Sequence, residues 1–110
     1  MTPLTFRVIR EGLGLTTSDA ADRLSIAQRT IDRWEAGATP IPPFAQQALA
    51  EWEARAAQTV KWWVESLDGD PSPKIVLTDG PDDEPLRWQR AIAFRVRLQL
   101  PDLIVCEAPE

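Results

Sequence analysis

Residues 15–37, LTTSDAADRLSIAQRTIDRWEAG, constrain the fold of this chain more than any other stretch. Their hydrophobic spacing predicts two short helices, about 17–24 and 28–36, separated by a tight turn. Thr16 is followed three residues later by Asp19, the pattern of a capping box at the start of the first helix. We therefore expect a pair of short helices that the preceding part of the chain supports.

The second helix of this pair has two different faces. Ile31 and Trp34 should be buried, and Ile26 in the turn should fill the space between the helices. The outer face should carry four polar side chains, Gln28, Arg29, Asp32 and Arg33. Glutamine and arginine can bond base edges in two places at once, but without further context such a face would be interpreted as solvated.

The chain before this pair predicts one more helix, about 3–13. Thr2 and Pro3 suit a helix start, and Gly14 suits the left-handed residue after a helix end. The amino end of helix 17–24 could hold a phosphate, because free N–H groups and the helix dipole point there. The hydroxyl side chains available at that end belong to Thr16, Thr17 and Ser18.

Residues 4–44 resemble the Cro/C1-type (XRE-like) helix-turn-helix family of DNA-binding proteins. The resemblance is carried by Phe6, Ile9, Arg10, Leu13-Gly14-Leu15-Thr16, Ala21, Leu24, Ile26, Thr30-Ile31 and Arg33-Trp34-Glu35-Ala36-Gly37. It implies that four residues face bases, namely Gln28, Arg29, Asp32 and Arg33. It also implies that Thr17 and Thr30 lie near phosphates, and that Arg10 pairs with Glu35.

Two residues depart from the pattern of that family. Ser25 replaces a usual glycine, and Ala27 replaces a usual hydroxyl cap. Loss of a cap costs about 1 kcal/mol and leaves the first residue of the second helix open. Gln28 then has two interpretations, as a base reader or as a cap-like phosphate contact.

The second half of the chain predicts a long helix, about 44–67, and a short strand, 74–78. Residues 86–100 fit either a strand or a helix, and their composition favours a helix at 86–99. LIVC at 103–106 predicts a second strand. The fold class expected is mainly α, with a lambda-repressor-like helix-turn-helix bundle in residues 1–43. Residues 44–110 would form a small C-terminal α/β dimerisation region.

Four tryptophans in this half suggest an interface between two copies of the chain: Trp52, Trp62, Trp63 and Trp88. Trp62 and Trp63 are adjacent and point about 100° apart on a helix, so one small core can hardly hold both. Tryptophan is enriched in protein interfaces. We therefore expect a homodimer.

Charge and composition narrow the function classes. The net charge is −5, but residues 1–45 are neutral, with five arginines and five acids, so the acid excess lies in 46–110. The chain has no histidine and one cysteine, which argues against an enzyme and leaves no metal set. No cofactor, metal or small-molecule substrate is expected. The acidic loop 79–84 should be solvated, and Cys106 should be a small buried hydrophobe.

The second half resembles, more narrowly, anti-CRISPR-associated autorepressors and YdiL-like regulators. That resemblance implies a homodimer on an inverted-repeat operator in the promoter of its own operon, with an anti-CRISPR operon as one candidate. We expect a repressor that binds double-stranded DNA. The alternative is the antitoxin of a toxin–antitoxin pair that also binds its promoter. No apolar run approaches the roughly 20 residues of a membrane span, and no signal peptide precedes the first helix, so a cytoplasmic location is expected.

Overall fold

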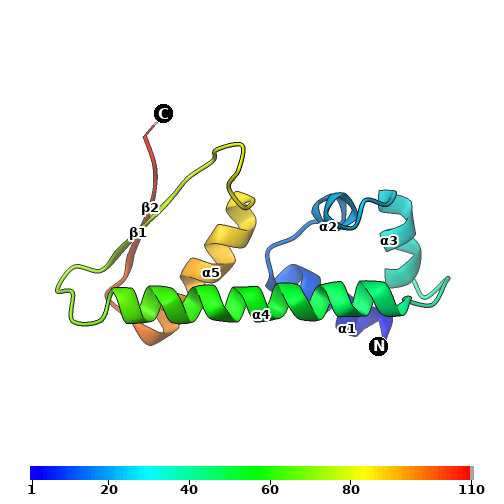
Figure 1. Ribbon diagram of the computed structural model, residues 1–110, viewed down its shortest axis with the longest axis horizontal. Coiled ribbons are helices and arrows are strands. Elements are labelled where there is room, and N and C mark those ends of the chain that lie inside the picture. The colour runs from blue at the N-terminus through cyan, green and yellow to red at the C-terminus, as the bar shows by residue number, and fades with distance from the viewer. Residues whose placement is uncertain (110) are drawn as a thin grey trace. The chain divides into compact units, whose positions relative to one another are not determined.

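The computed structural model describes residues 1–109 and is mainly helical, with a small two-stranded parallel sheet (Figure 1). The elements are α1 (Pro3–Gly12), α2 (Thr17–Leu24), α3 (Gln28–Glu35), α4 (Pro43–Ser66), β1 (Lys74–Leu77), α5 (Leu86–Gln99) and β2 (Ile104–Glu107). The ambiguous segment 86–99 is a helix, as its composition favoured. Within residues 1–109, no helix is both long enough and apolar enough to cross a membrane.

The chain divides into two compact units, residues 1–54 and 55–110. Because this division falls inside α4, the long helix contributes to both units. The domain boundary expected after residue 43 stays a prediction.

The helices of the first unit begin and end at the residues that favour caps. The Thr2 hydroxyl accepts a hydrogen bond of 3.0 Å from the Thr5 N–H at the start of α1. At the start of α2, the Thr16 hydroxyl accepts from the Asp19 N–H at 3.0 Å, and the Asp19 carboxylate accepts from the Thr16 N–H at 2.9 Å. The expected capping box is therefore complete. Gly14, with φ 71°, lies in the left-handed region just after α1.

A single hydrophobic cluster holds the first unit together. Its buried members are Phe6, Ala20, Ala21, Ile31, Trp34, Ile41, Ala45 and Leu49. Trp34 packs edge-to-face on Phe6, with ring centroids 5.8 Å apart, and on Phe44 at 6.1 Å. Residues of α1, α2, α3 and the first turns of α4 thus share one core, which fixes the positions of α2 and α3.

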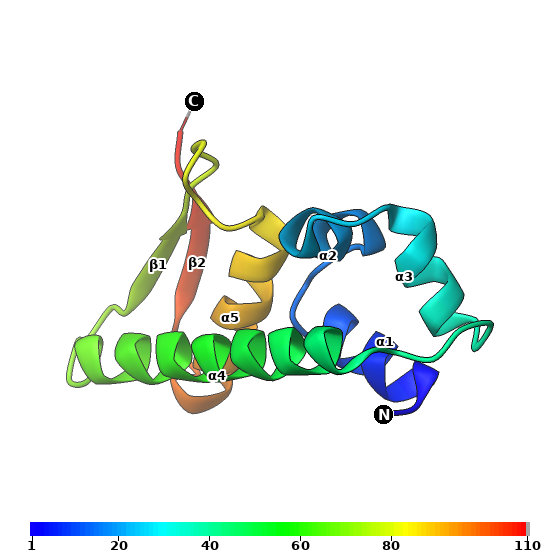
Figure 2. The same cartoon turned by 45° about the vertical axis from the view of Figure 1, so that its right-hand side comes forward.

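The second unit contains a strand–helix–strand arrangement. β1 and β2 pair in parallel, from Lys74 opposite Ile104 to Leu77 opposite Glu107, and α5 connects them (Figure 2). Alternate residues of β1 are buried, namely Ile75 and Leu77. The buried side chains of α5 are Trp88, Ile92, Ala93 and Val96. A crossover helix covering one face of a parallel pair explains this burial pattern.

Candidate nucleic-acid interface

The connection between α2 and α3 is only three residues long and depends on a left-handed residue. Ser25 has φ 56° and ψ 43°, and its N–H donates to the Asp22 carbonyl at 3.2 Å. The next N–H, that of Ile26, donates to the Ala21 carbonyl at 3.0 Å. The Ile26 side chain is half-buried against the core cluster, so it fills the space between the helices as expected. Ser25 thus adopts the conformation for which glycine is the usual residue.

The start of α3 lacks a side-chain cap. Ala27 is the N-cap residue and offers no side-chain acceptor, so Gln28 is the first residue of the helix. The Gln28 side-chain amide instead donates to the Thr17 hydroxyl at 3.0 Å. This bond joins the first turn of α3 to the first turn of α2. No local sequence pattern predicts this bond, because the two residues are eleven positions apart.

The outer face of α3 is polar and exposed. All four residues expected to face bases are exposed: Gln28, Arg29, Asp32 and Arg33. Ile31 and Trp34 lie on the opposite, buried face. Within residues 1–109 no hydrogen bond or ion pair engages the guanidinium group of Arg29 or Arg33. Both cations are therefore available to a ligand.

The four residues expected near phosphates differ in exposure and in whether their hydroxyl groups are already hydrogen-bonded. The Thr16 hydroxyl is engaged in the capping box, and the Thr17 hydroxyl accepts from Gln28. Ser18 is exposed, and Thr30 is half-buried. The N–H groups of Thr17 and Ser18 precede the first intrahelical bond of α2, as in any helix start. These two N–H groups and the Ser18 hydroxyl can bind an anion at this end of α2.

An ion pair that is largely excluded from solvent ties the end of α1 to the end of α3. Arg10 Nε and Nη2 donate to the two carboxylate oxygens of Glu35, each at 2.7 Å. Arg10 Nη1 also donates to the Leu15 carbonyl at 2.8 Å. The hydrogen bond to Glu35 raises the pKa of Arg10 above its ordinary value, despite the cost of burial. The Arg10–Glu35 pair that the family resemblance implied is thus present, and it fixes the last residue of α3 to α1.

The four tryptophans considered for a dimer interface differ in exposure. Trp62 is 59% exposed, whereas Trp88 is 3% exposed and belongs to the core of the second unit. Trp62 packs edge-to-face on the half-buried Trp63, with ring centroids 4.9 Å apart. Trp52 packs against the core of the first unit, and the Arg23 guanidinium lies 5.4 Å from its ring centroid. Of the four, Trp62 offers the most surface to a partner.

No known family model matches this chain, and no curated protein matches it either.

Proposed function

We propose that residues 1–43 form a lambda-repressor-like helix-turn-helix bundle that binds double-stranded DNA, with α3 as the recognition helix. One observation carries this proposal: α3 buries Ile31 and Trp34 and exposes Arg29 and Arg33, whose guanidinium groups have no partner among residues 1–109. A B-form major groove is about 12 Å wide and accepts one α-helix, whose side chains then reach base edges. The connection between α2 and α3 is three residues long, as a helix-turn-helix requires, and Gln28, Arg29, Asp32 and Arg33 are exposed.

The side chains of α3 suit different contacts. Arg29 and Arg33 can each bond the O6 and N7 acceptors of a guanine. Gln28 uses one of its two amide hydrogens on Thr17, so the other hydrogen and the carbonyl oxygen remain for an adenine. This bond would hold the Gln28 amide in one orientation, which favours its interpretation as a base reader. Asp32 can accept from a cytosine amino group.

The start of α2 suits the DNA backbone. The free N–H groups of Thr17 and Ser18 and the positive end of the helix dipole favour a phosphate there. Thr30 is half-exposed beside the base-reading face and can add a hydroxyl contact. Such contacts fix the register of the protein on DNA and make binding depend on salt.

We further propose that the chain is a homodimer that binds an inverted repeat and represses its own operon, with an anti-CRISPR operon as a candidate. Support comes from exposed apolar side chains in the second unit, Trp62, Phe94 and Leu98. Two-fold symmetry would place two copies of α3 about 34 Å apart, one turn of DNA. Sedimentation should give twice the chain mass at micromolar concentration, and a monomer there would contradict the dimer.

A mobility-shift assay on the DNA upstream of the gene tests the DNA-binding proposal. Arg33→Ala and Arg29→Ala should each weaken binding by about 1–3 kcal/mol, or roughly 5- to 150-fold. Arg7→Ala is the matched control, because Arg7 is an exposed arginine of α1 outside the proposed interface. Unchanged binding by Arg33→Ala, or no binding of the wild type even at low salt, would contradict the proposal. A footprint on the same DNA would give the site, its symmetry and the half-site spacing.

The exposed apolar surface of the second unit also suits an antitoxin, which would use it to bind a toxin. The two functions differ in their partners. Co-purification of a second protein of fixed stoichiometry would favour the antitoxin, and a pure homodimer that protects its own promoter would favour the repressor.

A further inference from the structure

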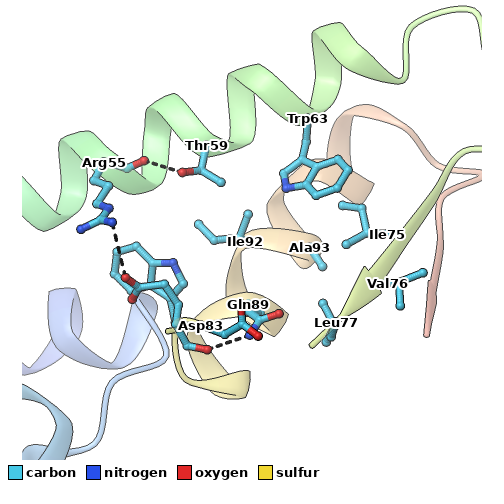
Figure 3. Close-up of a pocket in the computed structure, with 12 residues that line it drawn as sticks. Arg55, Thr59, Trp63, Ile75, Val76, Leu77, Asp83, Gln89, Ile92 and Ala93 are labelled. Atoms are coloured by element: carbon cyan, nitrogen blue, oxygen red, sulfur yellow. Dashed lines mark hydrogen bonds and ion pairs between the residues drawn. The ribbon is translucent and has the colours of Figure 1, made fainter. Parts of the chain in front are cut away.

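The second unit contains a cavity of about 250 Å³. Its apolar walls come from α4, β1 and α5, and include Trp63, Ile75, Leu77, Trp88 and Ile92 (Figure 3). Its polar rim contains Arg55, Asp83 and Glu84. Ligand sites are commonly apolar pockets with a few polar groups, at about 300–1,000 Å³. This cavity is therefore the size for a compound with a single ring.

One wall of the cavity is the unpaired edge of β1. The Ile104 N–H donates to the Pro73 carbonyl, and the Ala108 N–H donates to the Leu77 carbonyl, each at 2.9 Å. In a parallel ladder these bonds mean that residues 73, 75 and 77 direct their backbone groups toward β2. Lys74, Val76 and Thr78 direct theirs to the opposite edge, and Val76 lines the cavity.

At Thr78 this edge is completed by a side chain. The Thr78 N–H donates to Gln89 Oε1 at 3.1 Å, and Gln89 Nε2 donates to the Thr78 carbonyl at 2.6 Å. The planar amide of Gln89 thus bonds both backbone groups of Thr78, the residue directly after β1, as a neighbouring strand would. Gln89 Nε2 also donates to the Glu84 carbonyl at 2.7 Å, which holds the amide in place.

Two residues earlier, Val76 presents the same pair of backbone groups. Among residues 1–109 neither its N–H nor its C=O has a partner at this edge. We propose that the cavity binds a small, neutral, planar amide, such as an aromatic carboxamide or a lactam. Its N–H and C=O would bond the C=O and N–H of Val76, and its ring would pack against Trp63 and Ile92. The amide of Gln89 on Thr78 is the internal example of this contact.

The charge of the rim favours a neutral ligand over a carboxylate. Arg55 Nη2 lies 3.8 Å from the Glu84 carboxylate, which leaves Asp83 as a further negative charge. Hydrogen bonds from the Thr78 side chain and the Gly80 N–H lower the pKa of Asp83, so it is ionised at neutral pH. The edge also favours a small molecule over an added peptide strand. Within residues 1–109, only Lys74 and Val76 of β1 direct unpaired backbone groups to this edge, and Gln89 already occupies the backbone of Thr78, the next residue after β1.

Titration of the 110-residue chain with benzamide tests this site. The amide resonance of Val76 should shift in a saturable way, and tryptophan fluorescence should change with the same midpoint. N,N-dimethylbenzamide is the matched ligand control, because it keeps the ring and the acceptor but has no N–H donor. It should bind at least about tenfold more weakly. Benzoate should also bind more weakly than benzamide.

Two protein variants locate the contact. Val76→Pro removes the N–H at the cavity wall without removing a bond to β2, and should abolish benzamide binding. Lys74→Pro changes the same edge outside the cavity lining and should bind benzamide like the wild type. Circular dichroism checks that both variants fold, and the comparison of the two ligands on wild-type protein needs no variant.

Equal binding of both ligands, equal binding by both variants, or no saturable shift would overturn the proposal. Binding of an extended tetrapeptide without binding of benzamide would also overturn it. Because the site lies wholly in the second unit, this test is independent of DNA binding.

Discussion

Replacing Arg10 with alanine should destabilise the first unit strongly. The side chains of Arg10 and Glu35 are only 10% and 11% exposed, and Arg10 makes three side-chain hydrogen bonds of 2.7–2.8 Å. The substitution would leave the Glu35 carboxylate largely out of water without its cation, and the Leu15 carbonyl without this donor. Breaking one side of such a pair costs about 3–5 kcal/mol. A domain of this size has about 5–15 kcal/mol in total, so the loss is readily measured.

Urea unfolding followed by circular dichroism measures this loss. With an m value of about 1.5 kcal/mol/M, a cost of 3 kcal/mol lowers the midpoint by about 2 M. Arg7→Ala is the matched control, because Arg7 pairs with Glu11 on the exposed side of the same helix. Because solvent screens this exposed i,i+4 pair, its loss should move the urea midpoint far less than the loss of Arg10 does. The hydrogen bond to Glu35 raises the pKa of Arg10, so this contribution is present below the unfolded pKa of arginine and is lost only as the pH rises through the higher folded value.

The double variant Arg10→Met/Glu35→Leu separates the charge effect from packing. Replacing both partners with apolar groups of similar size is often neutral, apart from about 1–3 kcal/mol for the Leu15 carbonyl that loses its donor. The loss in free energy of unfolding for the double variant should therefore be smaller than the sum of the losses for Arg10→Met and Glu35→Leu, by at least about 2 kcal/mol. An Arg10→Ala midpoint shift no larger than that of Arg7→Ala, or strictly additive costs of the single variants, would contradict a stabilising buried pair.

Backbone conformation and local hydrogen bonds also determine how three single positions should respond. Ser25→Gly should stabilise the first unit by about 0.5–1 kcal/mol, since glycine relieves the left-handed strain at φ 56°, and a lower urea midpoint would contradict this. Ala27→Ser should supply the missing cap of α3 and raise the free energy of unfolding by about 1 kcal/mol. Ala36→Ser, just beyond the end of α3, is the control and should not raise it. The pKa of Asp83 lies below its ordinary 3.8, so its contribution to the 79–83 loop is present above that pH and is lost as the pH falls through the lower folded value. An NMR titration of the Asp83 carboxyl should show that lowered pKa, and an ordinary value would refute the hydrogen bonds assigned to it.

The first unit could be predicted from its sequence in some detail, because its signals are local. Thr16 and Asp19 specify a capping box within four residues, and Gly14 marks a helix end by its own backbone preference. The alternation of buried Ile31 and Trp34 with exposed Arg33 follows the period of one helix. The left-handed conformation of Ser25 could not be predicted from the sequence. A residue other than glycine is strained in that conformation, and it adopts it only where the surrounding fold requires it.

The tryptophans show where prediction from composition ends. Their number indicated an interface, but a tryptophan in a core and one in an interface have the same sequence signature. Trp88 is buried in its own unit, whereas Trp62 is exposed. The difference depends on which face of each helix the rest of the fold covers, and that is decided by contacts between residues far apart in the chain.

The cavity in the second unit depends on register, which short strands do not encode. The sequence of a four-residue strand such as β1 predicts an extended backbone. It does not predict which strand lies beside it or which of its residues bond to that strand. Once Ile75 and Leu77 pair with β2, the backbone of Val76 must face the other way, and so must that of Thr78. Gln89 then becomes a strand substitute only because α5 places it beside Thr78. From the sequence alone, Gln89 would be interpreted as an ordinary surface glutamine. Both the unpaired edge of β1 and the bonds of Gln89 to Thr78 therefore arise from tertiary contacts.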